Sequence, residues 1–134
     1  MDVTAETSAL LVAAGVRFAY LFGSRATGHH QPDSDADVAV LTDRPLTLLA
    51  ESRLCVDLAR ALDVPAVDLV DLRRAPLRLV GRILGEGVVI HGRDDPRRVE
   101  FEVVNRGRYF DFLPQQREHQ EAYLRHLAAE DPGG

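Results

Sequence analysis

A glycine–serine turn, followed after ten residues by a pair of aspartates, constrains this chain more than any other feature. One apolar run ends at Gly23-Ser24, and a second apolar run opens with Asp35-Ala36-Asp37. Side chains of a strand alternate between its two faces, so we expect Asp35 and Asp37 to point the same way and Ala36 to point the other way. The pattern predicts two core strands whose polar ends form one site at the edge of a sheet.

These residue types suit a metal-dependent nucleotide site. Two carboxylates held side by side on a rigid strand repel each other, and a divalent cation between them relieves the repulsion. Oxygen ligands in small number suit Mg²⁺, which completes its shell with water and substrate phosphates. Gly23 and Ser24 add backbone N–H groups and a hydroxyl at a strand-to-helix turn, where anions bind well. We therefore expect a metal and a triphosphate in one site.

The length and the apolar patterning predict an α/β protein with a small mixed β-sheet flanked by helices. A chain of 134 residues suits a single domain, with a core over about 4–92 and C-terminal helices over about 95–129. Strands are expected at 16–22, 35–41, 66–72 and 88–91. Helices are expected at 4–14, 47–62 and 76–86, with a helical turn at 24–28 and a long helical stretch from Asp95-Pro96 to about 127 that Pro114 interrupts.

Composition predicts a cytoplasmic protein with neither a membrane nor a nucleic-acid partner. No apolar stretch approaches the roughly 20 residues that span a bilayer, and the N-terminus lacks the basic-then-apolar pattern of a signal peptide. The single cysteine, Cys55, allows no internal disulfide, which fits a reducing compartment. The net charge of −5 disfavours nucleic acid, because binding a phosphate backbone draws on an excess of basic side chains.

The Gly23-Ser24 turn, the ten-residue gap and the Asp35-x-Asp37 pair resemble the pattern of the nucleotidyltransferase superfamily related to DNA polymerase β. More narrowly, the chain is similar to the minimal nucleotidyltransferases (MNT proteins), which act as antitoxins to HEPN-domain toxins. The similarity extends to segments 68–77 and 97–111 and so covers nearly the whole chain. It implies a polymerase β-like nucleotidyltransferase fold with a C-terminal helical segment.

The resemblance also implies a third acid beside the aspartate pair, and the third expected strand offers two. Asp68 and Asp71 are three residues apart, so they face opposite sides of a strand, and alternation alone does not choose between them. The third-strand pattern of the family, an acid at the start of the strand followed by apolar residues, falls on Asp68. For Asp71, capping of the following turn is the simpler interpretation.

By this resemblance, Asp35, Asp37 and Asp68 are the catalytic and metal-binding residues, and they hold two Mg²⁺ ions together with the phosphates of ATP. Gly23 and Ser24 bind the β- and γ-phosphates. Asp68 assists removal of the proton from the attacking hydroxyl, and pyrophosphate leaves.

Four positions close to the turn have roles that the sequence leaves open. Arg25 fits nucleotide binding through a phosphate and fits a structural role equally well. The family often carries a basic residue where Thr27 stands, which puts phosphate contacts at that position in doubt. His29 and His30 are typical of an exposed loop, with contact to a substrate as the alternative.

The function implied by the resemblance is that of an antitoxin that transfers AMP from ATP to a hydroxyl, expected to be a tyrosine, of a cognate HEPN toxin. The chain would then form a hetero-oligomer with that toxin. Its length leaves no room for the acceptor-binding domain of antibiotic nucleotidyltransferases, so a partner protein is the expected acceptor. Two alternatives remain open. One is an antitoxin that acts by tight binding alone, through the aromatic stretch 101–112. The other is a small-molecule nucleotidyltransferase that needs a second subunit to complete its acceptor pocket.

Overall fold

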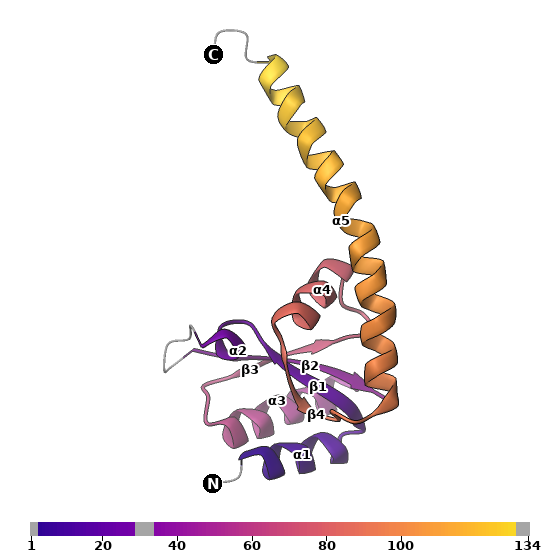
Figure 1. The fold of residues 1–134 in the computed structure, drawn as a ribbon. Coiled ribbons are helices and arrows are strands. Elements are labelled where there is room, and N and C mark those ends of the chain that lie inside the picture. Colours follow the sequence, from indigo (N-terminus) through magenta and orange to yellow (C-terminus); the bar gives the residue numbers. More distant parts are fainter. Residues whose placement is uncertain (1–2, 29–33, 131–134) are drawn as a thin grey trace.

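The structure, a computed structural model, describes residues 3–28 and 34–130, and these form a mixed four-stranded β-sheet flanked by helices (Figure 1). The elements are α1 (Val3–Ala13), β1 (Val16–Phe22), α2 (Ser24–Thr27), β2 (Ala36–Thr42), α3 (Leu48–Leu62), β3 (Val67–Asp71), α4 (Leu77–Glu86), β4 (Val88–His91) and α5 (Pro96–Glu130). The strand order is β3-β2-β1-β4. β1 pairs antiparallel with β2 and β4, and β2 pairs parallel with β3. The predicted α/β class and mixed sheet are confirmed.

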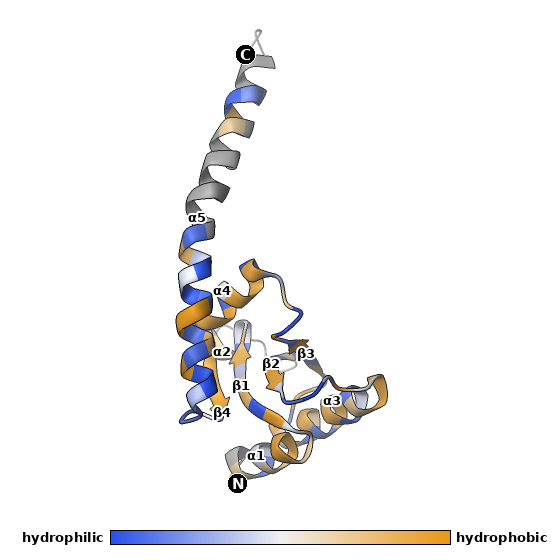
Figure 2. Cartoon of the chain, turned by 90° about the vertical axis from the view of Figure 1, so that its right-hand side faces the viewer, coloured by the Kyte–Doolittle hydropathy of each residue, from blue (hydrophilic) through white to orange (hydrophobic). Residues whose placement is uncertain are grey.

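Helices cover both faces of the sheet, which explains why β1 and β2 are apolar along nearly their whole length. In Figure 1, α1 and α3 lie on one face and α4 and the first part of α5 on the other. Leu11 of α1 and Leu58 of α3 pack with Val38 of β2 on the first face. Ile83 of α4 packs with Phe18 of β1 on the second. Figure 2 shows apolar residues along the strands and in parts of the helices that flank them.

Capping contacts mark the starts of α3 and α5, and the predicted cap at Asp95 is confirmed. Thr47 Oγ1 accepts the Ala50 N–H at 3.1 Å at the start of α3. Asp95 Oδ1 accepts the Arg97 N–H at 2.9 Å, directly before Pro96 opens α5. Both contacts satisfy backbone donors that have no acceptor inside their helix.

The prediction that Pro114 interrupts the C-terminal helix is wrong, because α5 runs without a break from Pro96 to Glu130. A proline inside a helix removes one hydrogen bond and crowds the carbonyl four residues earlier, at a cost of about 3 kcal/mol, but the helix can bend and continue. Figure 1 shows the axis of α5 changing direction about half-way along, where the helix has already left the sheet. Although α5 has 35 residues, no helix among the described residues is long and apolar enough to cross a membrane.

Alternation along residues 16–22 predicts Val16, Phe18 and Tyr20 on one face of the strand, and this prediction is wrong for Val16. The pairing of β1 with β2 shifts register between Val16 and Phe18. As a result, Val16 packs on the α1 and α3 face, whereas Phe18 and Tyr20 pack on the α4 and α5 face. A bulge changes which face a side chain meets, and nothing in the local sequence marks it.

A partly buried polar network connects α5 to the centre of the sheet. The Tyr20 hydroxyl donates to Glu102 Oε1 at 2.8 Å, and Arg98 Nη1 donates to the same oxygen at 2.8 Å. Tyr20 is only 2% exposed. Its burial, together with the neighbouring Glu102, raises the pKa of the phenol far above its ordinary value. The neutral hydroxyl therefore stays a donor throughout the working pH range.

We expect Glu102→Ala to lower the free energy of unfolding by about 2–3 kcal/mol, because it leaves the buried Tyr20 hydroxyl and the Arg98 guanidinium without their acceptor. Tyr20→Phe should cost about 1 kcal/mol, since Glu102 keeps its pair with Arg98. Urea denaturation followed by circular dichroism measures both. Glu100→Ala, at an exposed position of the same helix, is the matched control and should change stability by less than about 0.5 kcal/mol. Equal losses at 100 and 102 would contradict the role of the network.

Candidate active site

The Gly-Ser turn connects the end of β1 to the single turn of α2. Gly23 has φ +74° and ψ −153°, a conformation that favours glycine, and its carbonyl accepts the Ala26 N–H at 3.1 Å. Ser24 starts α2 and is exposed. Gly28, in the left-handed conformation, closes the turn by donating its N–H to the Ser24 carbonyl. The turn therefore places the exposed Ser24 directly after the end of β1, at the start of α2.

The aspartate pair lies against this turn. Asp35 directly precedes β2, and Asp37 is the second residue of that strand. Across the antiparallel ladder, Asp37 pairs with Phe22, the residue before Gly23. A methyl group at Gly23 would collide with Asp37 Oδ2. The Asp37 carboxylate thus lies against the bare backbone of the turn, and glycine is needed there for contact as well as for conformation.

Strand register brings Asp68 to the same place. In the parallel pairing of β2 with β3, Asp37 and Asp68 are direct partners. Residues in register on neighbouring strands point to the same face, so the Asp68 side chain lies on the face of the sheet that carries Asp37. The backbone therefore places Asp35, Asp37 and Asp68 at the beginning of β2 and β3, next to the Gly-Ser turn.

Asp71 lies elsewhere. It pairs with Val40, three residues beyond Asp37, and so belongs to the opposite face and the opposite end of the strand. Its Oδ1 accepts the Arg73 N–H at 2.9 Å, and its Oδ2 lies 3.8 Å from Arg74 Nε. Asp71 therefore caps the turn after β3, which is the simpler of the two interpretations that its sequence position allows.

The electrostatics of Asp37 agree with this clustering. Burial raises the pKa of the Asp37 carboxyl above its ordinary value, and repulsion by Asp68 and Asp35 adds to the increase. Arg82 of α4 acts in the opposite direction and lowers the same pKa. The charges of Asp35, Asp68 and Arg82 all affect the pKa of Asp37, so the four groups share one electrostatic environment.

The three carboxylates suit a hard divalent cation by ligand type and by backbone placement. Over residues 3–28 and 34–130, no three acidic, histidine or cysteine side chains are gathered closely enough to hold a metal ion. The backbone hydrogen bonds of the sheet fix the pairing of Asp37 with Asp68, so only side-chain rotation can change how close their carboxylates lie. Rotation of these side chains is the movement that would gather them around a cation.

Arg25 makes a contact within the chain. Its Nη2 donates to the Ser34 carbonyl at 2.7 Å, which links α2 to the residue before Asp35. This contact matches the structural role considered for Arg25 and leaves a contact with phosphate untested. The side chain of Thr27, and both His29 and His30, lie outside the described part of the structure.

Sequence reasoning missed Arg82 and its partner Glu86. Arg82 Nε donates to Glu86 Oε1 at 2.8 Å, and the two residues are one helical turn apart on α4. Their spacing alone indicates an ordinary surface ion pair. Only the packing of α4 over the sheet brings this pair into the electrostatic environment of Asp37.

Known proteins resemble this chain in sequence and in fold. Residues 8–96 match the family model described as polymerase beta, nucleotidyltransferase. The chain is 42% identical over 73 residues to the protein adenylyltransferase MntA of Shewanella oneidensis. That alignment covers 54% of this chain and 52% of the relative, so it spans about half the length of the curated relative.

Two solved structures resemble the whole fold. One is the crystal structure of a toxin–antitoxin with AMP-PNP, which matches with a TM-score of 0.70 and 26% identity over 96% of this chain and 99% of that one. The other is the tri-AMPylated HEPN toxin of Shewanella oneidensis in complex with an MNT antitoxin. It matches with a TM-score of 0.64 and 26% identity over 94% of this chain and 96% of that one.

Proposed function

Because this chain belongs to the polymerase beta nucleotidyltransferase family, we propose that it transfers AMP from ATP to a hydroxyl of a HEPN-domain toxin and acts as the antitoxin. The observation that carries the proposal is the strand register, which places Asp68 beside Asp37. Asp37 in turn lies against the Gly23 turn. The similarity to an adenylyltransferase and to a complex with an AMPylated HEPN toxin supports the choice of acceptor. A tyrosine hydroxyl of the toxin is the proposed acceptor group.

The proposed cofactor is Mg²⁺, as two ions held by Asp35, Asp37 and Asp68. When bound, the ions stabilise the charge on the attacking and leaving oxygens of an in-line displacement. The Ser24 hydroxyl and the backbone at Gly23 bind the phosphates beyond the one that is transferred. Asp37, held against Gly23, orients this end of the nucleotide.

In the reaction, a bond forms between the toxin oxygen and the α-phosphorus of ATP, and the bond from that phosphorus to the β-phosphate oxygen breaks. Asp68 accepts the proton of the toxin hydroxyl, and pyrophosphate leaves with the electrons of the broken bond. Asp68 is exposed, so an acceptor held by another protein can reach it.

A second candidate, an antitoxin that inhibits by binding alone, is favoured by the surface of α5. Of its aromatic stretch, Phe101 packs on Phe18 at a ring distance of 5.6 Å, and a side chain at Gly81 would collide with Tyr109. In contrast, Val104 is 51% and Phe110 is 68% exposed. The stretch is therefore divided between core packing and a surface open to a partner.

One experiment distinguishes the two candidates. The purified protein is incubated with ATP, Mg²⁺ and its cognate HEPN toxin, and the intact mass of the toxin is measured. Steps of one AMP support the enzyme, and no mass change contradicts it. The Asp35→Asn/Asp37→Asn double variant is then tested for protection of cells from the toxin. Protection by this variant with an unmodified toxin would show that binding alone is sufficient.

A further inference from the structure

Helix α4 lies over the same face of the sheet as Asp37 and ends near the site. Asp37 shares its face of β2 with Ala39, which belongs to the cluster that includes Ile83 of α4. A Cβ on Gly87, the residue after α4, would lie 3.4 Å from the Leu21 carbonyl. Leu21 in turn precedes Phe22, the strand partner of Asp37. The C-terminal half of α4 therefore lies close to the end of β1 that carries the Gly-Ser turn.

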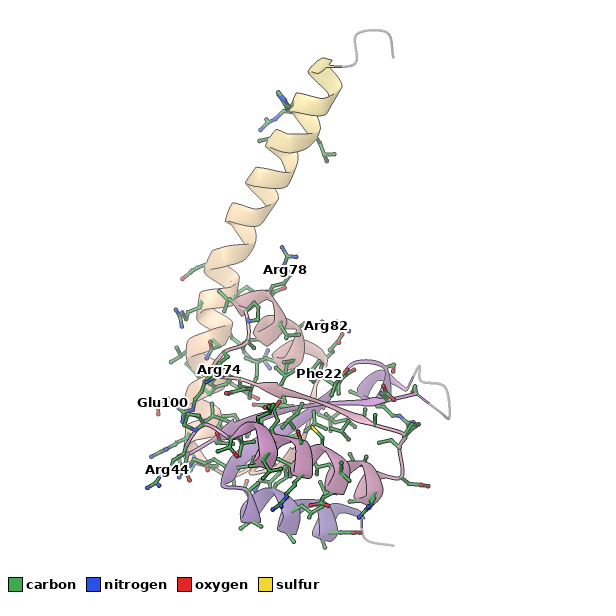
Figure 3. All side chains as sticks on the ribbon, turned by 180° about the vertical axis from the view of Figure 1, so that it is seen from behind. Phe22, Arg44, Arg74, Arg78, Arg82 and Glu100 are labelled. Carbon is green, nitrogen blue, oxygen red and sulfur yellow. The ribbon has the colours of Figure 1, made fainter. Side chains whose placement is uncertain are left out.

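Arg82 lies one helical turn after Leu79 on α4, outside the buried side that Val80, Ile83 and Leu84 form. Gly81 is turned toward Tyr109 of α5, and Arg82 lines one pocket with Leu79, Arg78 and Tyr109. In Figure 3, Arg82 leaves α4 toward the end of the molecule where Phe22 lies, whereas Arg78 points away from the sheet.

The guanidinium of Arg82 has more N–H donors than it uses in hydrogen bonds within the described residues. Its side chain is 59% exposed, and Nε donates to Glu86 Oε1 at 2.8 Å. A guanidinium carries five N–H donors, and within the described residues Arg82 donates to no other group.

We propose that Arg82 binds the triphosphate of ATP in this site, an inference that rests on the proposed function. Triphosphate is strongly anionic, and the planar guanidinium fork matches two phosphate oxygens at once. At the Gly-Ser turn, the guanidinium of Arg25 donates to the Ser34 carbonyl. Arg82 supplies a second positively charged side chain, from α4. Glu86 holds the guanidinium when no nucleotide is bound, and phosphate oxygens replace that carboxylate on binding.

The test compares four variants of the full chain for their affinity for ATP with Mg²⁺, measured by isothermal titration calorimetry. Arg82→Gln should weaken binding by about tenfold or more, while Arg82→Lys should restore part of the loss as a point charge. Arg78→Gln, which removes an arginine one turn away on the same helix, is the matched control and should stay within about twofold. Glu86→Gln should tighten binding, because it releases Arg82 and removes a negative charge. Melting temperatures without ligand check that all four remain folded.

Three outcomes would overturn the inference: unchanged affinity in Arg82→Gln, equal losses in Arg78→Gln and Arg82→Gln, or weaker binding in Glu86→Gln. Equal losses would mean that overall charge, and not contact, governs affinity. ATP binding is measured without toxin, so the outcome for Arg82 does not depend on whether the protein modifies the toxin. If the unsubstituted protein modifies the toxin but Arg82→Gln binds ATP normally, only the role of Arg82 fails. If Arg82→Gln loses ATP but the unsubstituted protein modifies no toxin, only the AMP transfer fails.

Discussion

Asp68→Asn is expected to abolish AMP transfer, with a loss of turnover on the order of a thousandfold, while Asp71→Asn keeps turnover close to that of the unsubstituted protein. Asp68 is in register with Asp37 at the site, whereas Asp71 pairs with Val40 on the other face. Asparagine keeps the size of the side chain but removes the charge that holds a cation and the basicity that accepts a proton. The rate of AMP incorporation into the cognate toxin, followed by intact mass, measures both variants.

Asp71→Asn serves as the matched control, because it makes the same chemical change three residues away on the same strand. Its amide oxygen can still accept the Arg73 N–H, and the exposed pair with Arg74 contributes little. We expect a stability loss of at most about 1 kcal/mol. Stabilisation by ATP with Mg²⁺, seen as a rise in melting temperature, should be reduced in Asp68→Asn and retained in Asp71→Asn. If Asp71→Asn is the inactive variant and Asp68→Asn is active, the assignment of the third acid is wrong.

The sequence was sufficient for the Gly-Ser turn and the aspartate pair because both depend on local patterns. Alternation along one strand places Asp35 and Asp37 on one side, and the glycine before the serine marks a turn. The choice between Asp68 and Asp71 by contrast depends on how β3 pairs with β2, a contact between segments about thirty residues apart. Residue spacing leaves two candidates, the family pattern favours Asp68, and strand register provides an independent reason for the same choice.

Two of the features that the sequence did not supply have the same origin in tertiary structure. Proline usually interrupts a helix, which predicts a break at Pro114. Helix α5 nevertheless continues past this residue, where it has left the sheet and can bend. Arg82 and Glu86 have the spacing of a common surface pair. Their relation to Asp37 comes from the docking of α4 on the sheet through Val80, Ile83 and Leu84, which no local pattern around position 82 encodes.

Gly23→Ala is expected to lower AMP transfer by about a hundredfold or more. Two effects combine at this position. The φ of +74° is one that residues with a side chain adopt only at a cost of about 1–3 kcal/mol. The added methyl group would also collide with Asp37 Oδ2, and its next nearest atom would be Asp37 Cγ at 3.4 Å. The carboxylate must therefore move away from the position in which the turn holds it. Turnover and urea denaturation together measure the two effects.

Gly28→Ala separates backbone strain from displacement of the carboxylate. Gly28 lies at the other end of the same one-turn helix, has a φ of +78°, and a Cβ there would meet no atom of the described structure within 4 Å. Its substitution should therefore cost a similar amount of stability and leave turnover within a few-fold of the unsubstituted protein. Gly15→Ala, at φ +79° and equally open, repeats the control at the start of β1, away from the site. If Gly28→Ala loses as much turnover as Gly23→Ala, strain in the turn is the cause. If Gly23→Ala alone loses turnover while all three lose similar stability, the contact between the bare Gly23 backbone and the Asp37 carboxylate is what the site requires.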